Sequence, residues 1–149
     1  MADGPVEAFV ARAREFVDFV ARASTLSPSE RLSTARSRLL DLYTAAVSLP
    51  ADFAERVDAD DTVTPPAQWP GFGSHDWYWE VFDPYIEAPL VMGSLSDDVL
   101  DVYRDIQRGL AQWDAGHRRA ATWEWRYCAH SIARAKRTRD QGWMTAVVV

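Results

Sequence analysis

Apolar residues recur at steps of three and four through the first part of the chain, which is the spacing of one face of an α-helix. One stripe predicts a helix over about residues 5–24. It consists of Val6, Phe9, Val10, Ala13, Phe16, Val17 and Val20. A second stripe predicts a helix from Pro28 to about Ser48. It consists of Leu32, Ala35, Leu39, Leu42, Tyr43 and Ala46.

A helix-start signal lies between these two stripes. Ser27 can cap the second helix, Pro28 suits its first position, and Glu30 can return a hydrogen bond to the cap. Because the connection is short, the two helices are expected to pack antiparallel.

Helical spacing stops at Leu49 and returns only after Ser74, which predicts a long loop over about residues 49–74. Loops of this length in compact domains are often functional. Trp69 and Phe72 are expected to pin the loop to the body of the protein. Its prolines, glycines and central acids are Pro50, Pro65, Pro66, Pro70, Gly71, Gly73, Asp58, Asp60 and Asp61.

The next apolar segment is aromatic. Its spacing predicts a short helix that Pro84 kinks or ends, with an aromatic face directed into the core. This face consists of Tyr78, Trp79, Phe82, Tyr85 and Ile86.

Two further long helices are expected after it. The first begins at Ser96, carries Asp97 and Asp98 in its first turn, and ends at the turn 114–116. Its stripe is Val99, Tyr103, Ile106, Leu110 and Trp113. The second runs antiparallel to it over about residues 118–140, and an apolar tail, 143–149, is either docked or an aggregation liability.

Trp123 and Trp125 lie on the last predicted helix, about 200° apart around its axis. They cannot both face one neighbour. Either this helix is sandwiched inside the bundle, or one indole lies on a surface that a partner covers.

These elements predict an all-α fold, an antiparallel bundle of four long helices plus one short aromatic helix. The 149 residues are 48% hydrophobic, which suits one domain, 1–149, with a core that needs no disulfide or metal. With one cysteine and no long apolar run, the chain is expected to be cytoplasmic and not membrane-bound.

Three motifs follow one another in the second half of the chain: the aromatic run 78–85, the Gly-Ser-Leu-Ser-Asp-Asp run 93–98 and the Trp-Glu-Trp-Arg run 123–126. The segment 38–127 that contains them resembles the bacterial family Domain of Unknown Function 5063. The resemblance implies a small helical domain in a bacterial protein and implies no reaction.

Charge is unevenly distributed along the chain, whose net charge is −6. Residues 41–114 carry fifteen acids and three bases, whereas residues 115–149 carry seven bases and two acids. The basic last helix either neutralises the acidic segment inside the fold, which we favour, or leaves an acidic face that attracts a basic partner. Nucleic acid is not an expected partner.

An enzymatic alternative rests on acids one helical turn apart. Glu80 with Asp83, and Asp101 with Asp105, could bind magnesium and support a metal-dependent phosphohydrolase. Such pairs also arise by chance among 22 acids, and Asp101 and Asp105 fall on a flank expected to be solvated. We therefore expect no metal, no cofactor and no catalytic residue.

The favoured hypothesis is a bacterial protein–protein interaction module, of an inhibitor or immunity type, that binds another, basic protein. The sequence carries no signal for an oligomeric state. The residues expected to face the partner are Asp58, Asp60, Asp61, Trp69, Phe72 and Trp125.

Overall fold

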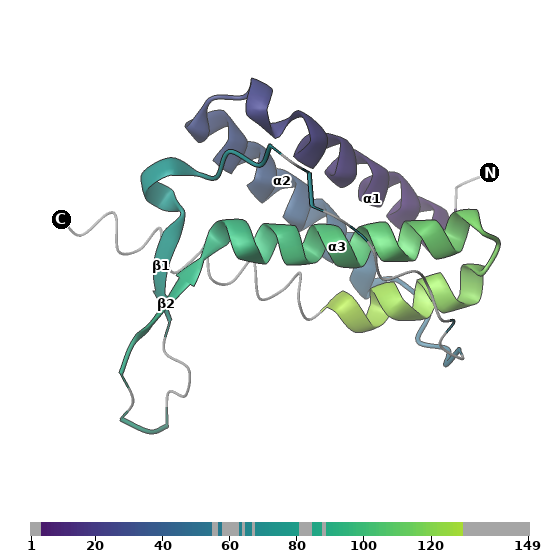
Figure 1. Cartoon of the computed structure of the whole chain (residues 1–149). Helices are drawn as coiled ribbons and strands as arrows, with labels where there is room; N and C mark the ends of the chain where they lie inside the picture. Colours follow the sequence, from purple (N-terminus) through teal and green to yellow (C-terminus); the bar gives the residue numbers. More distant parts are fainter. Residues whose placement is uncertain are drawn as a thin grey trace.

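The computed structural model describes residues 4–54, 57, 63, 65–66, 68–80, 85–87 and 89–129. Over these residues the chain is mainly helical, with a small two-stranded sheet (Figure 1). Residues 118–129 form a helical segment after the last labelled helix. The labelled elements are α1 (Pro5–Arg22), η1 (Ala23–Thr25), α2 (Pro28–Val47), η2 (Gly73–His75), β1 (Trp77–Glu80), β2 (Val91–Ser94) and α3 (Leu95–Asp114).

α1 and α2 form the antiparallel pair that the sequence predicts (Figure 1). The capping box at the start of α2 is complete. The Ser27 hydroxyl accepts a hydrogen bond from the Glu30 amide, and the Glu30 carboxylate accepts one from the Ser27 amide at 2.9 Å. These bonds satisfy amides that have no partner within the helix, so α2 starts at a defined residue.

A buried arginine fastens the turn between these helices. Arg31 is 5% exposed, and its guanidinium donates to the carbonyl of Ala23 at 2.9 Å and to that of Leu26 at 2.8 Å. A third hydrogen bond goes to the carbonyl of Gly71, 40 residues along the chain. One side chain therefore holds the first helix pair and the long loop together.

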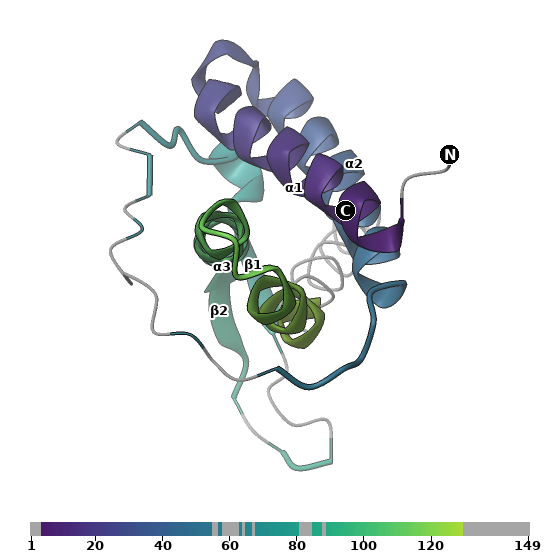
Figure 2. The same cartoon turned by 90° about the vertical axis from the view of Figure 1, so that its right-hand side faces the viewer.

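α3 starts one residue earlier than predicted. Ser94 is its cap and accepts a hydrogen bond from the Asp97 amide at 3.2 Å, while Asp97 and Asp98 occupy the first turn as expected. At the other end the chain reverses through Gly116, whose φ of 91° suits glycine. Residues 118–129 then return beside α3 (Figure 2).

The core lies between α1, α2, α3 and residues 118–129, and Trp125 is at its centre with no exposed area. The indole packs on Phe9 and Trp113, with ring centroids 4.9 and 5.9 Å apart. It also lies against Gly109 of α3, where any Cβ would overlap it. This contact shows that residues 118–129, the described part of the predicted last helix, pack beside α3.

The prediction of a short aromatic helix after residue 77 is wrong where the structure describes the segment. Trp77–Glu80 is a strand that pairs antiparallel with Val91–Ser94. Aromatic side chains favour strands as well as apolar helix faces, and helical spacing cannot separate the two over so short a run. The fold is therefore mainly α with a small sheet and is not all-α.

The loop that precedes β1 is anchored by the two aromatic residues that the sequence singles out. Trp69 packs edge-on against Phe72 at 5.3 Å and against Phe19 of α1 at 6.4 Å. Its indole N–H donates to the Ser96 hydroxyl of α3 at 2.8 Å. Phe72 has no exposed area, so the predicted anchoring is confirmed.

Candidate functional site

The two strands form a hairpin that projects from one end of α3 (Figure 1). Residues directly opposite each other in an antiparallel pair share a face, and successive residues alternate between faces. Trp79 lies opposite Met92 and Trp77 lies opposite Ser94, so these residues line one face. We call Trp77, Trp79 and Met92 the hairpin face.

The opposite face of the hairpin is fastened to the helical body. The Tyr78 hydroxyl donates to the Asp98 carboxylate of α3 at 2.6 Å, and the Tyr78 ring lies over Gly93 of the facing strand. At the base of the hairpin, the Asp76 carboxylate accepts the Ser96 amide at 2.9 Å. These bonds fix the direction in which the hairpin face points.

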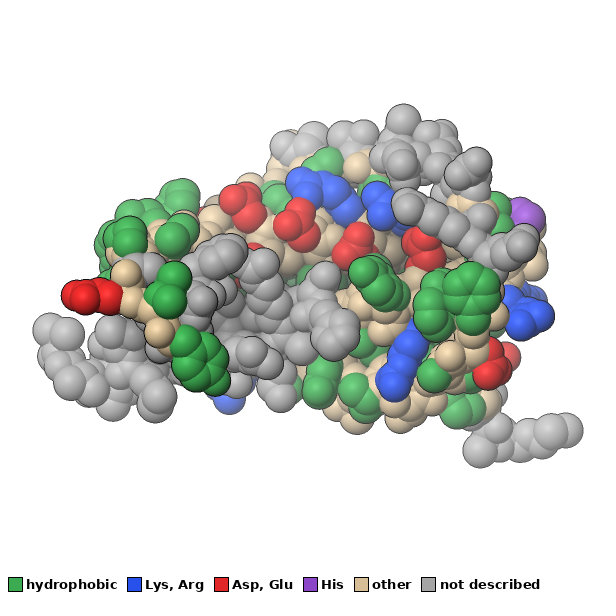
Figure 3. Space-filling model, turned by 90° about the horizontal axis from the view of Figure 1, so that it is seen from below, with side chains coloured by type: hydrophobic (Ala, Val, Ile, Leu, Met, Phe, Trp, Pro, Cys, Tyr) green, Lys and Arg blue, Asp and Glu red, His purple; other side chains and the backbone are tan. Residues whose placement is uncertain are grey.

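The hairpin face itself is open to solvent. Trp77 is 63% exposed, Trp79 is 60% exposed and Met92 is 53% exposed. Further exposed apolar side chains lie toward the tip, namely Tyr85, Ile86, Leu90 and Val91. Figure 3 shows apolar side chains gathered at this end of the molecule. Exposed apolar side chains gathered in one part of a molecule mark interaction surfaces more often than scattered single residues do.

The segment that contains the hairpin has acids and no Lys or Arg. Between Arg56 and Arg104 the sequence has ten acids. They are Asp58, Asp60, Asp61, Asp76, Glu80, Asp83, Glu87, Asp97, Asp98 and Asp101. The exposed apolar side chains therefore belong to a segment of uniformly negative charge.

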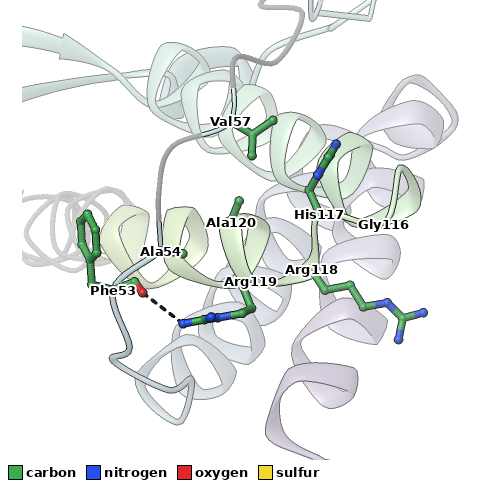
Figure 4. A pocket seen from close by; sticks show the side chains of 8 residues that line it. All are labelled: Phe53, Ala54, Val57, Gly116, His117, Arg118, Arg119 and Ala120. Atoms are coloured by element: carbon green, nitrogen blue, oxygen red, sulfur yellow. Dashed lines mark hydrogen bonds between the residues drawn. The ribbon is translucent and has the colours of Figure 1, made fainter.

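A second feature is a recess of about 680 Å³ at the start of the helical segment 118–129 (Figure 4). Phe53, Ala54, Val57 and Ala120 supply apolar lining, and Gly116, His117, Arg118 and Arg119 complete it. Arg119 donates a long hydrogen bond, 3.4 Å, to the Phe53 carbonyl. Arg118 lies over the Trp113 ring, 4.8 Å from its centroid. The basic side chains thus already have contacts within the chain, and the recess is wide and open.

Comparison with known proteins places the chain in a family. Residues 2–128 match the model of a domain of unknown function, DUF5063. The chain belongs to the DUF5063 family. The resemblance that the three motifs suggested is thereby confirmed, and the match extends it to the first helix.

A solved structure supports the DUF5063 fold. The crystal structure of protein BF1032 from Bacteroides fragilis is similar to this chain, with a TM-score of 0.68 and 20% sequence identity. The similarity covers 93% of this chain and 92% of that one, and at such identity it shows the fold alone. No curated protein matches the chain. Among the helices described, none has the length and apolarity needed to cross a bilayer.

The predicted partner-facing residues of this DUF5063 protein are only partly accessible. Trp125 cannot meet a partner because it is fully buried, so this prediction is wrong: the smallest side chain on α3, Gly109, makes room for it in the core. Phe72 is fully buried, and Trp69, which is half-buried, packs on it and anchors the loop to α3. Asp58, Asp60 and Asp61 lie outside the described residues.

Of the two acid pairs in the enzymatic alternative, Asp101 and Asp105 lie as predicted, one turn apart on α3, and the pair of Glu80 with Asp83 does not. Glu80 lies on β1 and not on a helix, and Asp83 is outside the described residues. Asp101 forms an ion pair with Arg104 of its own helix, and Asp105 forms one with Arg108 at 3.7 Å. Within the part of the chain that the structure describes, no three His, Cys, Asp or Glu side chains group as a metal site.

Asp105 is also less solvated than predicted. Its side chain is 27% exposed and forms a hydrogen bond with the Cys128 thiol. Burial raises the pKa of the Asp105 carboxyl, against the lowering effect of that bond and of Arg108. Burial, together with the neighbouring Asp105 carboxylate, raises the pKa of the Cys128 thiol to about 12. A thiol in this state is a poor nucleophile at neutral pH.

Sequence reasoning missed the hairpin face. The signal was present, since Trp77, Tyr78 and Trp79 in succession suit a pleated strand, and Gly93 offers space for an aromatic ring from the facing strand. Helical spacing over the same run points to a helix instead, and the two signals conflict.

Proposed function

We propose that this DUF5063 protein is a protein–protein interaction module of the bacterial cytoplasm and that the hairpin face is its binding surface. The exposure of two tryptophans and a methionine on one side of a fastened hairpin carries the proposal. Tryptophan is enriched among the residues that dominate binding energy at interfaces. A single cysteine without a disulfide partner supports the compartment.

The energy available from this surface is substantial. An aromatic side chain buries about 150–250 Å², and apolar burial contributes about 25 cal/mol per Å². A partner that covers the exposed part of one indole therefore gains roughly 2–4 kcal/mol before ordering costs are subtracted. The hydrogen bond from Tyr78 to Asp98 reduces those costs because the hairpin is already oriented.

The charge of the segment defines the chemistry of the partner. Residues 57–103 include ten acids and no Lys or Arg, and one of these acids, Asp101, pairs with Arg104. The remaining excess of negative charge favours a partner with an apolar surface bordered by Lys and Arg. An inhibitor or immunity-type protein would bind such a surface on a basic target and cover it.

A photo-crosslinking amino acid at position 92, used in cells, would identify proteins that contact the hairpin face. The identified partner is then purified and titrated. Trp79→Ser should weaken its binding at least about tenfold. Tyr127→Ser is the matched control, since Tyr127 is 73% exposed on the last helix, and it should leave the affinity unchanged.

The proposal also predicts that salt slows association with the purified partner, because steering by exposed charges is screened. Equal affinity for the parent and the Trp79→Ser variant, with both folded, would overturn the proposal. The proposal would also be overturned if the crosslinked surface of the partner lacked Lys and Arg and the association rate did not change with salt.

A further inference from the structure

The hydrogen-bonding pattern of the hairpin determines which backbone N–H and C=O groups point away from the facing strand. In an antiparallel pair, hydrogen-bonded residue pairs alternate with non-hydrogen-bonded pairs. The Leu95 amide donates to the Asp76 carbonyl at 2.7 Å, one step before the first pair of the sheet. Tyr78–Gly93 is therefore a hydrogen-bonded pair, whereas Trp77–Ser94 and Trp79–Met92 are not.

This pattern leaves two residues of β1 with their backbone groups directed away from β2. The N–H and C=O of Trp77 and Trp79 point to the outer edge of the strand, because Tyr78 supplies the groups that face Gly93. The sheet has two strands, so no described strand pairs with this edge. The residues with outward backbone groups are also those with the most exposed indoles among the tryptophans that the structure describes.

Proteins usually protect such an edge with lysine, proline or a bulge. None of these is present over β1: its residues are Trp77, Tyr78, Trp79 and Glu80, and the register advances one residue at a time on both strands. An open edge beside an apolar face is the arrangement used when a partner contributes a strand.

We infer that the outer edge of β1 accepts an extended segment of a partner protein as an added strand. The inference rests on the proposed function and specifies the binding mode. The segment would exchange hydrogen bonds with the N–H and C=O of Trp77 and Trp79. Its side chains would alternate between apolar residues and Lys or Arg. The apolar residues would pack on the indoles, and the basic residues would be attracted to the acidic segment.

A second copy of this chain is the less favourable occupant. Joining two β1 edges would pair two copies of a strand whose surrounding sequence, residues 57–103, has acids and no Lys or Arg. Like charges at short range cost free energy in an interface. A basic strand from another protein gains from the same charges.

The test uses the full-length protein and an end-capped peptide of alternating valine and arginine as the probe. The matched control peptide is the same sequence with N-methyl groups on alternate residues of one edge, which keeps the charge and side chains and removes strand donors. The parent protein should bind the first peptide at least about tenfold more tightly than the N-methylated one.

Two variants at position 79 separate the contribution of the backbone N–H to peptide binding from that of the side chain. Trp79→Thr and Trp79→Pro both lose the indole, but only proline removes the outward N–H. The Tyr78–Gly93 pair keeps the ladder in both, and amide spectra of α3 verify that each variant is folded. Trp79→Pro should bind the peptide about tenfold more weakly than Trp79→Thr.

The outcomes test two claims separately: strand addition at the edge of β1, and binding by the hairpin face. Equal affinity for both peptides, or for both variants, overturns strand addition but leaves the hairpin face in place if Trp79→Thr still weakens binding. If neither variant weakens binding, both proposals fail. Failure of the peptide to bind at millimolar concentration overturns strand addition, and a dimer that Trp79→Pro dissociates makes a second copy the occupant.

Discussion

Arg31 shows how one side chain can organise distant parts of this fold. It is buried, and its donors reach the carbonyls of Ala23, Leu26 and Gly71. A buried charge is tolerated only when its hydrogen bonds are made, and here backbone oxygens supply the partners. The loop before the hairpin is thus tied to the turn between α1 and α2.

Arg31→Met should lower the free energy of unfolding by about 3–5 kcal/mol, since the buried carbonyl of Ala23 and the half-buried carbonyls of Leu26 and Gly71 lose their donor. Arg12→Met is the matched control, because Arg12 is exposed and pairs with Glu15 on the surface of α1. It should leave the unfolding midpoint nearly unchanged. Denaturant titration measures both, and similar midpoints for the two variants would show that the Arg31 contacts contribute little.

Cys128 gives a prediction that depends on pH. Its pKa is raised from 9.0 to about 12, mainly by burial, so the folded thiol should react with iodoacetamide at pH 8 about a thousandfold more slowly than the unfolded one. Because the folded pKa is the higher one, the stabilisation from this thiol is complete below about pH 9 and is lost as the pH rises toward 12. Cys128→Ala should therefore lose less stability than the parent over that interval, and an equal loss would contradict the buried thiol.

At the scale of elements, the helices were predictable and the hairpin was not. The capping box, the acidic first turn of α3 and the glycine turn after it are local signals, and each one is present in the structure. The hairpin depends on contacts between residues far apart in the chain, such as Tyr78 with Gly93 and Asp98. Local spacing does not contain such contacts, so it predicts a helix for the aromatic run.

The hairpin can be tested through the close contact that shapes it. The Tyr78 ring occupies the space where a Cβ on Gly93 would lie, so Gly93→Ala should displace the ring and break its bond to Asp98. The expected loss is about 1–3 kcal/mol. Tyr78→Phe removes the same bond directly.

The double variant provides the control for this prediction. If the two changes act on one contact, adding Tyr78→Phe to Gly93→Ala should cost less than Tyr78→Phe costs alone. Fully additive losses in denaturant titrations would mean that the ring does not couple Gly93 to Asp98.

At the scale of the whole molecule, the DUF5063 chain combines a helical body with a hairpin that leaves apolar side chains uncovered (Figure 1, Figure 3). The body uses its tryptophans internally: Trp125 fills the core and Trp69 anchors the loop. Trp77 and Trp79, in contrast, are 63% and 60% exposed on the hairpin face. Composition alone could not separate these classes, because burial of Trp125 depends on the space that Gly109 leaves on a different helix.

The central claim is that the outer edge of β1 is available to a partner strand. Amide hydrogen exchange of the free protein, followed by NMR, tests this claim most directly. The hydrogen-bond pattern predicts slow exchange for the amides of Tyr78 and Gly93, because each donates to the carbonyl of the other residue. It predicts fast exchange for the amides of Trp77 and Trp79, which face outward. Protection of Trp77 and Trp79 equal to that of Tyr78 would show that the edge is already covered. Fast exchange at all four positions would show that the hairpin does not form.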